Sequence, residues 1–204
     1  MTWYIIRHGQ SVGNVEPGHG DDPPLTPLGR EQARLTGQRL AHETQVAQVV
    51  ASTMKRAAET AQIIGGIVGA EPVLVDWLRE HDVTPFAGKT LEEIEAAWPG
   101  MWREELWDGW NWRTPQGESF RDLYDRVSAG AEALKRDYAG ATLAIVSHGC
   151  AGAFLMGYLL GGQEDAFGRF GWSNCGVSCL EFRRGRAHLC YHNDRCHLTS
   201  SARD

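Results

Sequence analysis

The stretch YIIRHGQSVGN, Tyr4 to Asn14, decides how the rest of the chain is interpreted. Its apolar start is typical of a buried strand, and the strand-like run ends abruptly in Arg7, His8 and Gly9. A single histidine at a strand end is commonly an ordinary hydrogen-bonded loop residue. The triplet therefore indicates a function only if other polar residues follow other strands in the same way.

Strand-like and helix-like segments alternate along the chain. Short apolar runs predict strands, and longer segments of helical periodicity predict helices. The predicted strands are 3–7, 46–52, 72–76 and 143–147, and the predicted helices are 27–43, 54–68, 91–98, 119–138 and 151–160. The segments 176–182 and 187–193 flank the connection RRGR and predict a terminal hairpin.

This alternation is typical of βαβ units, in which helices cover both faces of a parallel sheet. We therefore expect an α/β fold, a three-layer α/β/α sandwich whose mostly parallel central sheet has an antiparallel edge strand. A chain of 204 residues suits one such domain. Residues 1–204 are predicted to form a single domain, with a Trp-rich helical insertion at about residues 90–116.

The composition limits the classes of partner. A net charge of −6 does not favour nucleic acid or an acidic membrane surface, and an anionic substrate would need a local positive cluster. Residues 139–162 carry no Asp, Glu, Lys or Arg, but they change from strand-like to helix-like and contain six glycines. We interpret them as a buried strand and a buried helix rather than a membrane span. With no signal peptide at the N-terminus, the protein is predicted to be cytoplasmic.

The chain has an odd number of cysteines, and all lie in its last third. This usage is typical of reduced intracellular thiols rather than of a disulfide framework. A zinc site is the alternative, but the spacing provides no paired C-x₂-C clamps. We expect structural thiols and no metal at Cys150, Cys175, Cys179, Cys190 and Cys196.

Polar residues also follow the other predicted strands. Ser147-His148-Gly149 repeats the His-Gly pair after strand 143–147, while Arg56 and Glu80 follow the strands at 46–52 and 72–76. The carboxyl ends of parallel strands are where sites of α/β proteins gather. If the two histidine-bearing strands are neighbours, their backbones lie ~4.8 Å apart and the imidazoles can approach closely.

Two histidines, two arginines and one carboxylic acid suit phosphoryl transfer. A neutral imidazole can attack phosphorus and carry the phosphoryl group. Arginines contact phosphate oxygens in a bidentate manner, and a carboxylic acid can protonate the leaving oxygen and then activate water. The cationic side chains supply the charge that a metal would otherwise supply, so neither a metal nor a cofactor is expected.

The chain resembles the histidine phosphatase superfamily, the phosphoglycerate mutase-like group, in an ordered set of motifs. The set runs through almost the whole chain, which makes it far more specific than one Arg-His-Gly triplet. The motifs are RHGQSVGN (7–14), LTPLGREQA (25–33), STMKRAAETA (52–61), LRE (78–80), GESF (117–120), VSHG (146–149) and NDRCHL (193–198).

The resemblance implies a role for each matching residue. His8 would be the phosphorylated nucleophile and Glu80 the proton donor. Arg7, Arg56 and His148 would bind the phosphoryl group. Further phosphate contacts are implied for Asn14 and the Gly149 backbone, with Gln10, Ser11 and Ser147 as neighbours.

One segment departs from the family pattern. Many members continue after the acid with Gly-x-Trp-Glu-Gly, whereas residues 84–88 read TPFAG, so Ala87 stands in place of the second Glu. Because LRE still holds its place, the acid is assigned to Glu80, and Asp82 is the fallback.

The resemblance leaves mutase and phosphatase to be distinguished. A mutase must keep its phosphoenzyme away from water, and mutase members have a longer insertion around the site. The stretch 81–118 is short, and in this length the chain resembles the phosphatase members. We therefore predict a phosphomonoesterase acting on a small phosphorylated metabolite. A phosphoglycerate mutase-type transferase and a catalytically idle binding domain are the alternatives, and the oligomeric state, a homodimer included, is not determined.

Five of the eight tryptophans lie between Trp98 and Trp112. Tryptophan buries a large area wherever it sits, so the first interpretation is a helical hairpin that packs on the core. The second is a lid over the pocket that favours substrates with an apolar or aromatic leaving group.

Overall fold

The computed structural model describes residues 1–16, 22–82, 89–99, 110–111, 113, 117–162, 169–198 and 202. The described strands form one sheet in the order β3-β2-β4-β1-β5-β6. The first four run parallel to one another: β3 (Val73–Val75), β2 (Gln48–Ser52), β4 (Thr142–Ser147) and β1 (Thr2–Arg7). The hairpin of β5 (Val177–Arg183) and β6 (Arg186–Asp194) adds antiparallel pairs beside β1, which confirms the predicted mixed sheet.

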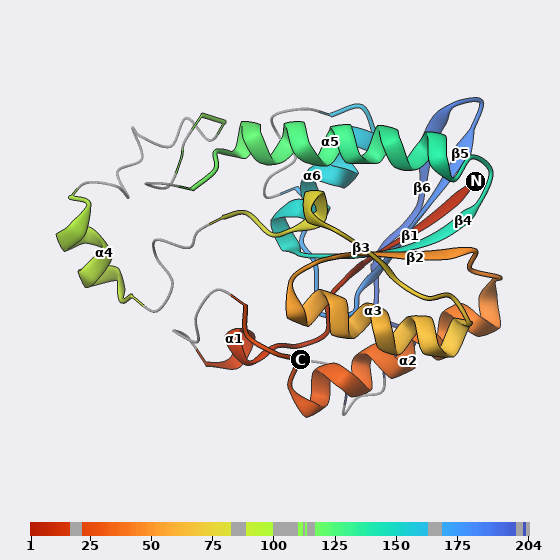
Figure 1. Cartoon of the computed structure of the whole chain (residues 1–204), viewed down its shortest axis with the longest axis horizontal. Helices are drawn as coiled ribbons and strands as arrows, with labels where there is room; N and C mark the ends of the chain where they lie inside the picture. The colour runs from red at the N-terminus through yellow and green to blue at the C-terminus, as the bar shows by residue number, and fades with distance from the viewer. Residues whose placement is uncertain are drawn as a thin grey trace.

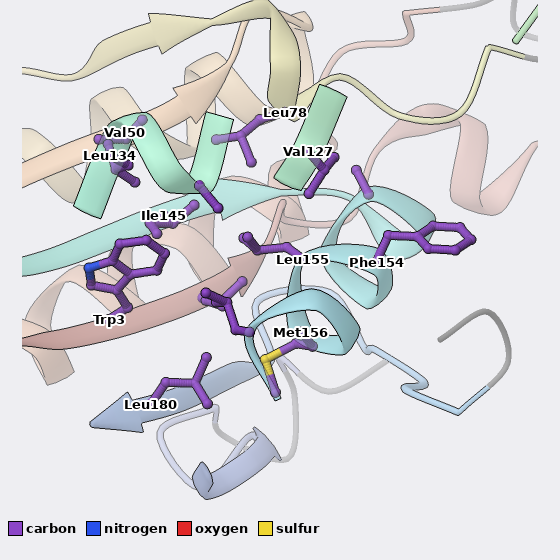
Figure 2. Close-up of a cluster of buried hydrophobic side chains, with 14 of the residues drawn as sticks. Trp3, Val50, Leu78, Val127, Leu134, Ile145, Phe154, Leu155, Met156 and Leu180 are labelled. Carbon is purple, nitrogen blue, oxygen red and sulfur yellow. The ribbon is translucent and has the colours of Figure 1, made fainter. Parts of the chain in front are cut away.

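One face of the sheet carries the larger core. Alternate side chains of β1, including Trp3 and Ile5, point to this face and are fully buried. Helices α5 (Phe120–Asp137) and α6 (Gly149–Leu159) cover it, as Figure 1 shows. Figure 2 shows how Leu155 of α6 lies among the strand side chains of this cluster.

The other face carries a second core. The intervening side chains of β1, Tyr4 and Ile6, pack there with Leu40 and other buried apolar residues. Helices α2 (Pro27–Glu43) and α3 (Lys55–Val68) cover this face (Figure 1). The sheet is therefore sandwiched between two helical layers, as the alternating sequence pattern predicts.

The predicted elements are found with small shifts of their ends. Elements absent from the prediction are the short helix α1 (Val12–Val15) and the 3-10 turn η1 (Asp76–Leu78). Helix α4 (Leu91–Ala97) lies in the predicted insertion. Within the hairpin, the strands leave a turn of only Arg184 and Gly185, both with positive φ (51° and 77°), as a type I′ turn requires.

The Trp-rich segment is described only in part. Residues 100–109, 112 and 114–116 lie outside the described residues, so the helical hairpin and the lid stay predictions. Trp110 is described, and its ring packs against Tyr124 and Phe154 with centroids 5.2 and 6.3 Å away. For this ring the core-packing interpretation holds.

Two other sequence interpretations concern the last third of the chain. The uncharged stretch 139–162 contains β4 and α6 and not one long helix. In the part of the chain that the structure describes, none of the helices is both long enough and apolar enough to cross a membrane. All five cysteines are free thiols.

Two helical glycines provide a test of how tightly the helices pack. A Cβ added at Gly130 of α5 would lie 2.1 Å from Cδ2 of the Trp77 ring, whereas one at Gly66 of α3 would meet nothing within 4 Å. We expect Gly130→Ala to lower the free energy of unfolding by about 1–3 kcal/mol through overpacking. Gly66→Ala should raise it by about 0.5–1 kcal/mol, the helix-propensity gain.

Urea denaturation of both variants measures these changes as shifts of the midpoint at an unchanged m-value. A stabilised Gly130→Ala variant would show that the Trp77 ring of η1 does not pack tightly against α5.

Candidate active site

The site begins where β1 and β4 end side by side. These strands are paired with Arg7 opposite Ser147, and the His8 N–H donates to the Ser147 carbonyl at 2.9 Å. The imidazoles of His8 and His148 consequently lie with ring centroids 5.1 Å apart. The prediction that the two His-Gly pairs share one edge of the sheet is confirmed.

His8 has a defined tautomer and a defined direction. Its Nδ1 lies 2.7 Å from the Gly9 carbonyl oxygen, which can only accept, so the ring proton sits on Nδ1. The other nitrogen, Nε2, accepts from Nε of Arg56 at 3.2 Å. Burial, followed by the charges of Arg56 and Arg7, lowers the pKa of His8 well below its ordinary value. The imidazole is therefore neutral, and Nε2 carries the ring's lone pair.

His148 is fully buried and is held by β2. Its Nε2 lies 2.8 Å from the Ser52 hydroxyl, which also accepts from the Met54 N–H. Ser52 can donate its own hydrogen to Nε2, which leaves the ring proton on Nδ1. Burial above all, then the charges of His8, Arg56 and Arg7, lowers the pKa of His148 well below the ordinary value.

The two arginines approach from different elements. Arg7 ends β1, and its Nη1 donates to the Trp172 carbonyl at 2.5 Å. Arg56 lies in the first turn of α3, is only 8% exposed and forms an ion pair with Asp22 at 3.5 Å. Burial lowers the pKa of Arg56, and the carboxylates of Glu80 and Asp22 oppose that shift.

Glu80 follows η1 and reaches the first turn of α6. Its Oε1 accepts from the N–H groups of His81 and Ala151 at 3.0 Å each, and its Oε2 accepts from that of Cys150 at 3.1 Å. The acid therefore lies beside the strand end that carries His148. Asp82, the fallback acid, is exposed and lies two residues farther along, so the geometry favours Glu80.

The side chains of three residues expected near the phosphate form hydrogen bonds with other residues of the protein. Gln10 accepts a hydrogen bond from the Thr26 hydroxyl at 2.8 Å, which ties it to the start of α2. Ser11 donates through its N–H and its hydroxyl to Oδ1 of Asn14 and caps α1. Phosphate contacts from Gln10, Ser11 and Asn14 stay predictions.

Gly9 is explained by packing against a second glycine. A Cβ at Gly9 would lie 2.4 Å from the Gly29 carbonyl oxygen, and one at Gly29 would lie 2.0 Å from that of Gln10. The backbone after β1 therefore touches the start of α2 directly. Such a contact leaves no room for a side chain at either position.

Several residues that support the site do not follow a predicted strand, so the sequence pattern did not single them out. Asn174 is 2% exposed, and its Nδ2 donates to the His8 carbonyl at 3.0 Å and to Asn14 at 3.2 Å. Thr60 accepts from the Gly9 N–H at 3.0 Å. Ser52 and Thr60 lie inside the STMKRAAETA motif, which was the available signal for them.

Two side-chain nitrogens of the site are buried without being used in the hydrogen bonds described above. Arg7 Nε and His148 Nδ1 are buried and have no hydrogen-bond partner among the residues that the structure describes. A buried unsatisfied donor costs about 1–3 kcal/mol. Both belong to neighbours of His8, since Arg7 precedes it in the chain and the His148 ring centroid lies 5.1 Å from that of His8. The described residues include no group of three or more His, Cys, Asp or Glu that could hold a metal ion.

The family model described as "Histidine phosphatase superfamily (branch 1)" matches residues 3–195. A protein named "Probable phosphoglycerate mutase GpmB" from Photorhabdus laumondii is 32% identical over 184 residues, covering 88% of this chain and 84% of that protein.

Solved structures match over the same length. Bacillus stearothermophilus YhfR superposes with a TM-score of 0.84 at 29% identity, covering 96% of this chain and 98% of that one. A mycobacterial glucosyl-3-phosphoglycerate phosphatase, in a structure with VO3, superposes with a TM-score of 0.81 at 26% identity, covering 95% and 99%.

The buried histidines predict how folding stability depends on pH. Because the pKa values of His8 and His148 are lowered in the folded protein, the unfolded chain binds protons that the folded chain does not bind below about pH 6.5. The free energy of unfolding should therefore fall from that pH downward until the folded-state pKa values are reached. Each histidine contributes at most about 1.4 kcal/mol per pH unit.

Urea denaturation in phosphate-free buffer from pH 7.5 to 5.5 measures this slope. We expect His148→Gln to reduce it, while His188→Gln, which removes an exposed histidine on β6, leaves it unchanged. Equal slopes in the two variants would contradict the lowered pKa of His148.

Proposed function

The chain belongs to the histidine phosphatase superfamily and is an enzyme of the phosphatase type, and from that premise we propose that it is a metal-independent phosphomonoesterase. Its substrate is a small phosphorylated metabolite, and the reaction passes through a phosphohistidine on His8. His8, Glu80, His148, Arg7 and Arg56 are the catalytic residues.

One observation carries the proposal. His8 presents a neutral Nε2, and buried donors without partners, Arg7 Nε and His148 Nδ1, belong to residues around it. A phosphoryl group before Nε2 offers oxygens to both donors and to Arg56. Such preorganised donors are most effective where water is excluded, and phosphoryl transfer depends mainly on positioning and electrostatics.

In the first step, the Nε2 lone pair of His8 attacks phosphorus. The N–P bond forms as the bond from phosphorus to the leaving oxygen breaks, and Glu80 delivers its proton to that oxygen. The Nδ1–H···O bond to Gly9 keeps the ring oriented while positive charge develops on it. Arg7, Arg56 and His148 stabilise the equatorial oxygens.

In the second step, water attacks the phosphohistidine. Glu80, now a carboxylate, takes a proton from the water as the new O–P bond forms. The N–P bond breaks, and its electron pair returns to Nε2. Inorganic phosphate leaves, and His8 and Glu80 are restored to their starting protonation states.

Mutase activity is the alternative. The relative named as a phosphoglycerate mutase supports it, whereas the mycobacterial structural neighbour is named as a phosphatase. We favour hydrolysis because the stretch between Glu80 and Ser119 is short, as in the phosphatases that the sequence resembles. A catalytically idle binding domain is disfavoured, since every predicted catalytic residue is present and the described residues bring all five to one edge of the sheet.

The phosphohistidine can be trapped directly. When the protein is mixed with a ³²P-labelled phosphomonoester in EDTA and quenched, we expect an acid-labile, alkali-stable label on His8. Loss of the nucleophile in His8→Ala should abolish the label and lower kcat on the order of 10⁴- to 10⁶-fold, a size seen for other nucleophiles. Unimpaired hydrolysis by His8→Ala would contradict the mechanism, and loss of activity in EDTA would indicate a metal.

The mutase and phosphatase alternatives separate on product analysis. With 3-phosphoglycerate beside an aryl phosphate, the proposal predicts release of inorganic phosphate from both and no 2-phosphoglycerate. Formation of 2-phosphoglycerate faster than inorganic phosphate, measured by ³¹P NMR, would assign the chain to the transferases.

A further inference from the structure

Glu80 stands on an irregular piece of chain. Residues 76–82, called here the acid segment, consist of one 3-10 turn and four residues in neither helix nor strand. His8 and His148, by contrast, directly follow hydrogen-bonded strands. The acid segment therefore needs some other support to hold a carboxyl group in place.

That support comes from α5 and the residue preceding its cap. Arg126 donates through Nη1 to the Trp77 carbonyl at 2.7 Å and through Nη2 to the Glu80 carbonyl at 3.1 Å. Glu118 Oε1 accepts from the Asp82 N–H at 3.1 Å. The Glu118 carbonyl lies 2.9 Å from Nε2 of His81, which must be the donor.

The two supporting residues also bind each other. Arg126 Nε and Nη2 donate to the two carboxylate oxygens of Glu118 at 2.8 and 2.5 Å, a bidentate pair. Their side chains are 25% and 17% exposed, so solvent screens the pair only partly. The start of α5 is stabilised by the capping box that Ser119 and Asp122 form.

Glu80 is thus held from two sides. Arg126 binds its backbone carbonyl, while the α6 amides of Cys150 and Ala151 bind its carboxyl group. The contacts of His8 differ: they come from Ser147, Gly9, Asn174 and Arg56. A change at Arg126 therefore removes hydrogen bonds of the acid segment and none of those of His8, while the Arg126 charge is one of several that lower the pKa of His148.

We propose that Glu118 and Arg126 are positioning residues that set the general acid Glu80 against the leaving oxygen. This inference rests on the proposed function. It makes the pair important in the step in which the bond from phosphorus to the leaving oxygen breaks and Glu80 transfers its proton to that oxygen. A leaving group that departs as a stable anion needs no such proton.

Two substrates separate this role from a general structural one. p-Nitrophenyl phosphate releases a stable phenolate, whereas glycerol 2-phosphate releases an alkoxide that must be protonated. We expect Arg126→Gln to lower kcat/KM for glycerol 2-phosphate on the order of 10²-fold, the lower range for general acid catalysis. Its effect on p-nitrophenyl phosphate should be no more than a few-fold.

Matched variants complete the design. Lys135→Gln removes another cation of α5, paired with Glu132 at 2.5 Å and outside the acid segment, and should change neither substrate's kinetics. Glu118→Gln should reproduce the selective loss in milder form. In the Glu80→Gln background, Arg126→Gln should add almost nothing, because both changes remove the same proton transfer.

Equal losses on both substrates, an undiminished rate on glycerol 2-phosphate, or full additivity with Glu80→Gln would overturn the proposal. If Arg126→Gln fails to fold, the Glu118→Gln variant decides by the same ratio of substrates. His8→Ala keeps the two hypotheses apart: its retained activity would refute the phosphohistidine mechanism itself. A requirement for His8 together with an unselective loss in the Arg126 and Glu118 variants would refute only the positioning role.

Discussion

β1 and β4 are hydrogen-bonded in parallel with Arg7 opposite Ser147, and this pairing places His8 and His148, which directly follow the two strands. Since side chains alternate along a strand, a slip by one residue would turn Trp3 and Ile5 out of their core and exchange the two faces. The packing of two hydrophobic cores therefore fixes the register. His8 and His148 directly follow these strands, so the same packing fixes the separation of their imidazole rings.

The second constraint is electrostatic. Two imidazoles and two guanidinium groups share a mostly buried edge of a chain whose net charge is −6. Burial and mutual repulsion keep the pKa values of both histidines low, so the histidines stay neutral, while Glu80 and Asp22 offset part of the burial cost of Arg56. The result is a mostly buried cluster of two guanidinium groups and two neutral imidazoles, which receives the phosphate dianion in the proposed mechanism. The acidic surface elsewhere does not cancel the charge of this cluster, because exposed charges beyond about 8–10 Å are screened.

Sequence reasoning could predict the layers and the polar residues after each strand, because these follow from periodicity and from the chemistry of His8, Arg56 and Glu80. The adjacency of the two histidine-bearing strands is only a condition of that prediction. Sequence reasoning could not predict contacts between elements distant in the chain. The bond from Asn174 to the His8 carbonyl depends on how the β5 hairpin docks beside β1. Nor does any local pattern reveal that the backbone at Gly9 packs against Gly29 of α2.

The site is therefore supported in two different ways. His8 and His148 directly follow strands in the middle of the sheet, where the ladder and both cores fix them. Glu80 depends on side-chain bonds from α5 and on the first amides of α6. In the proposed mechanism, the strand-borne groups face the phosphoryl group, which all monoesters share, whereas the acid faces the leaving group, in which monoesters differ. A side-chain network can change without altering the sheet register, so the leaving-group side is the part of this site that can be changed while the phosphate side stays intact.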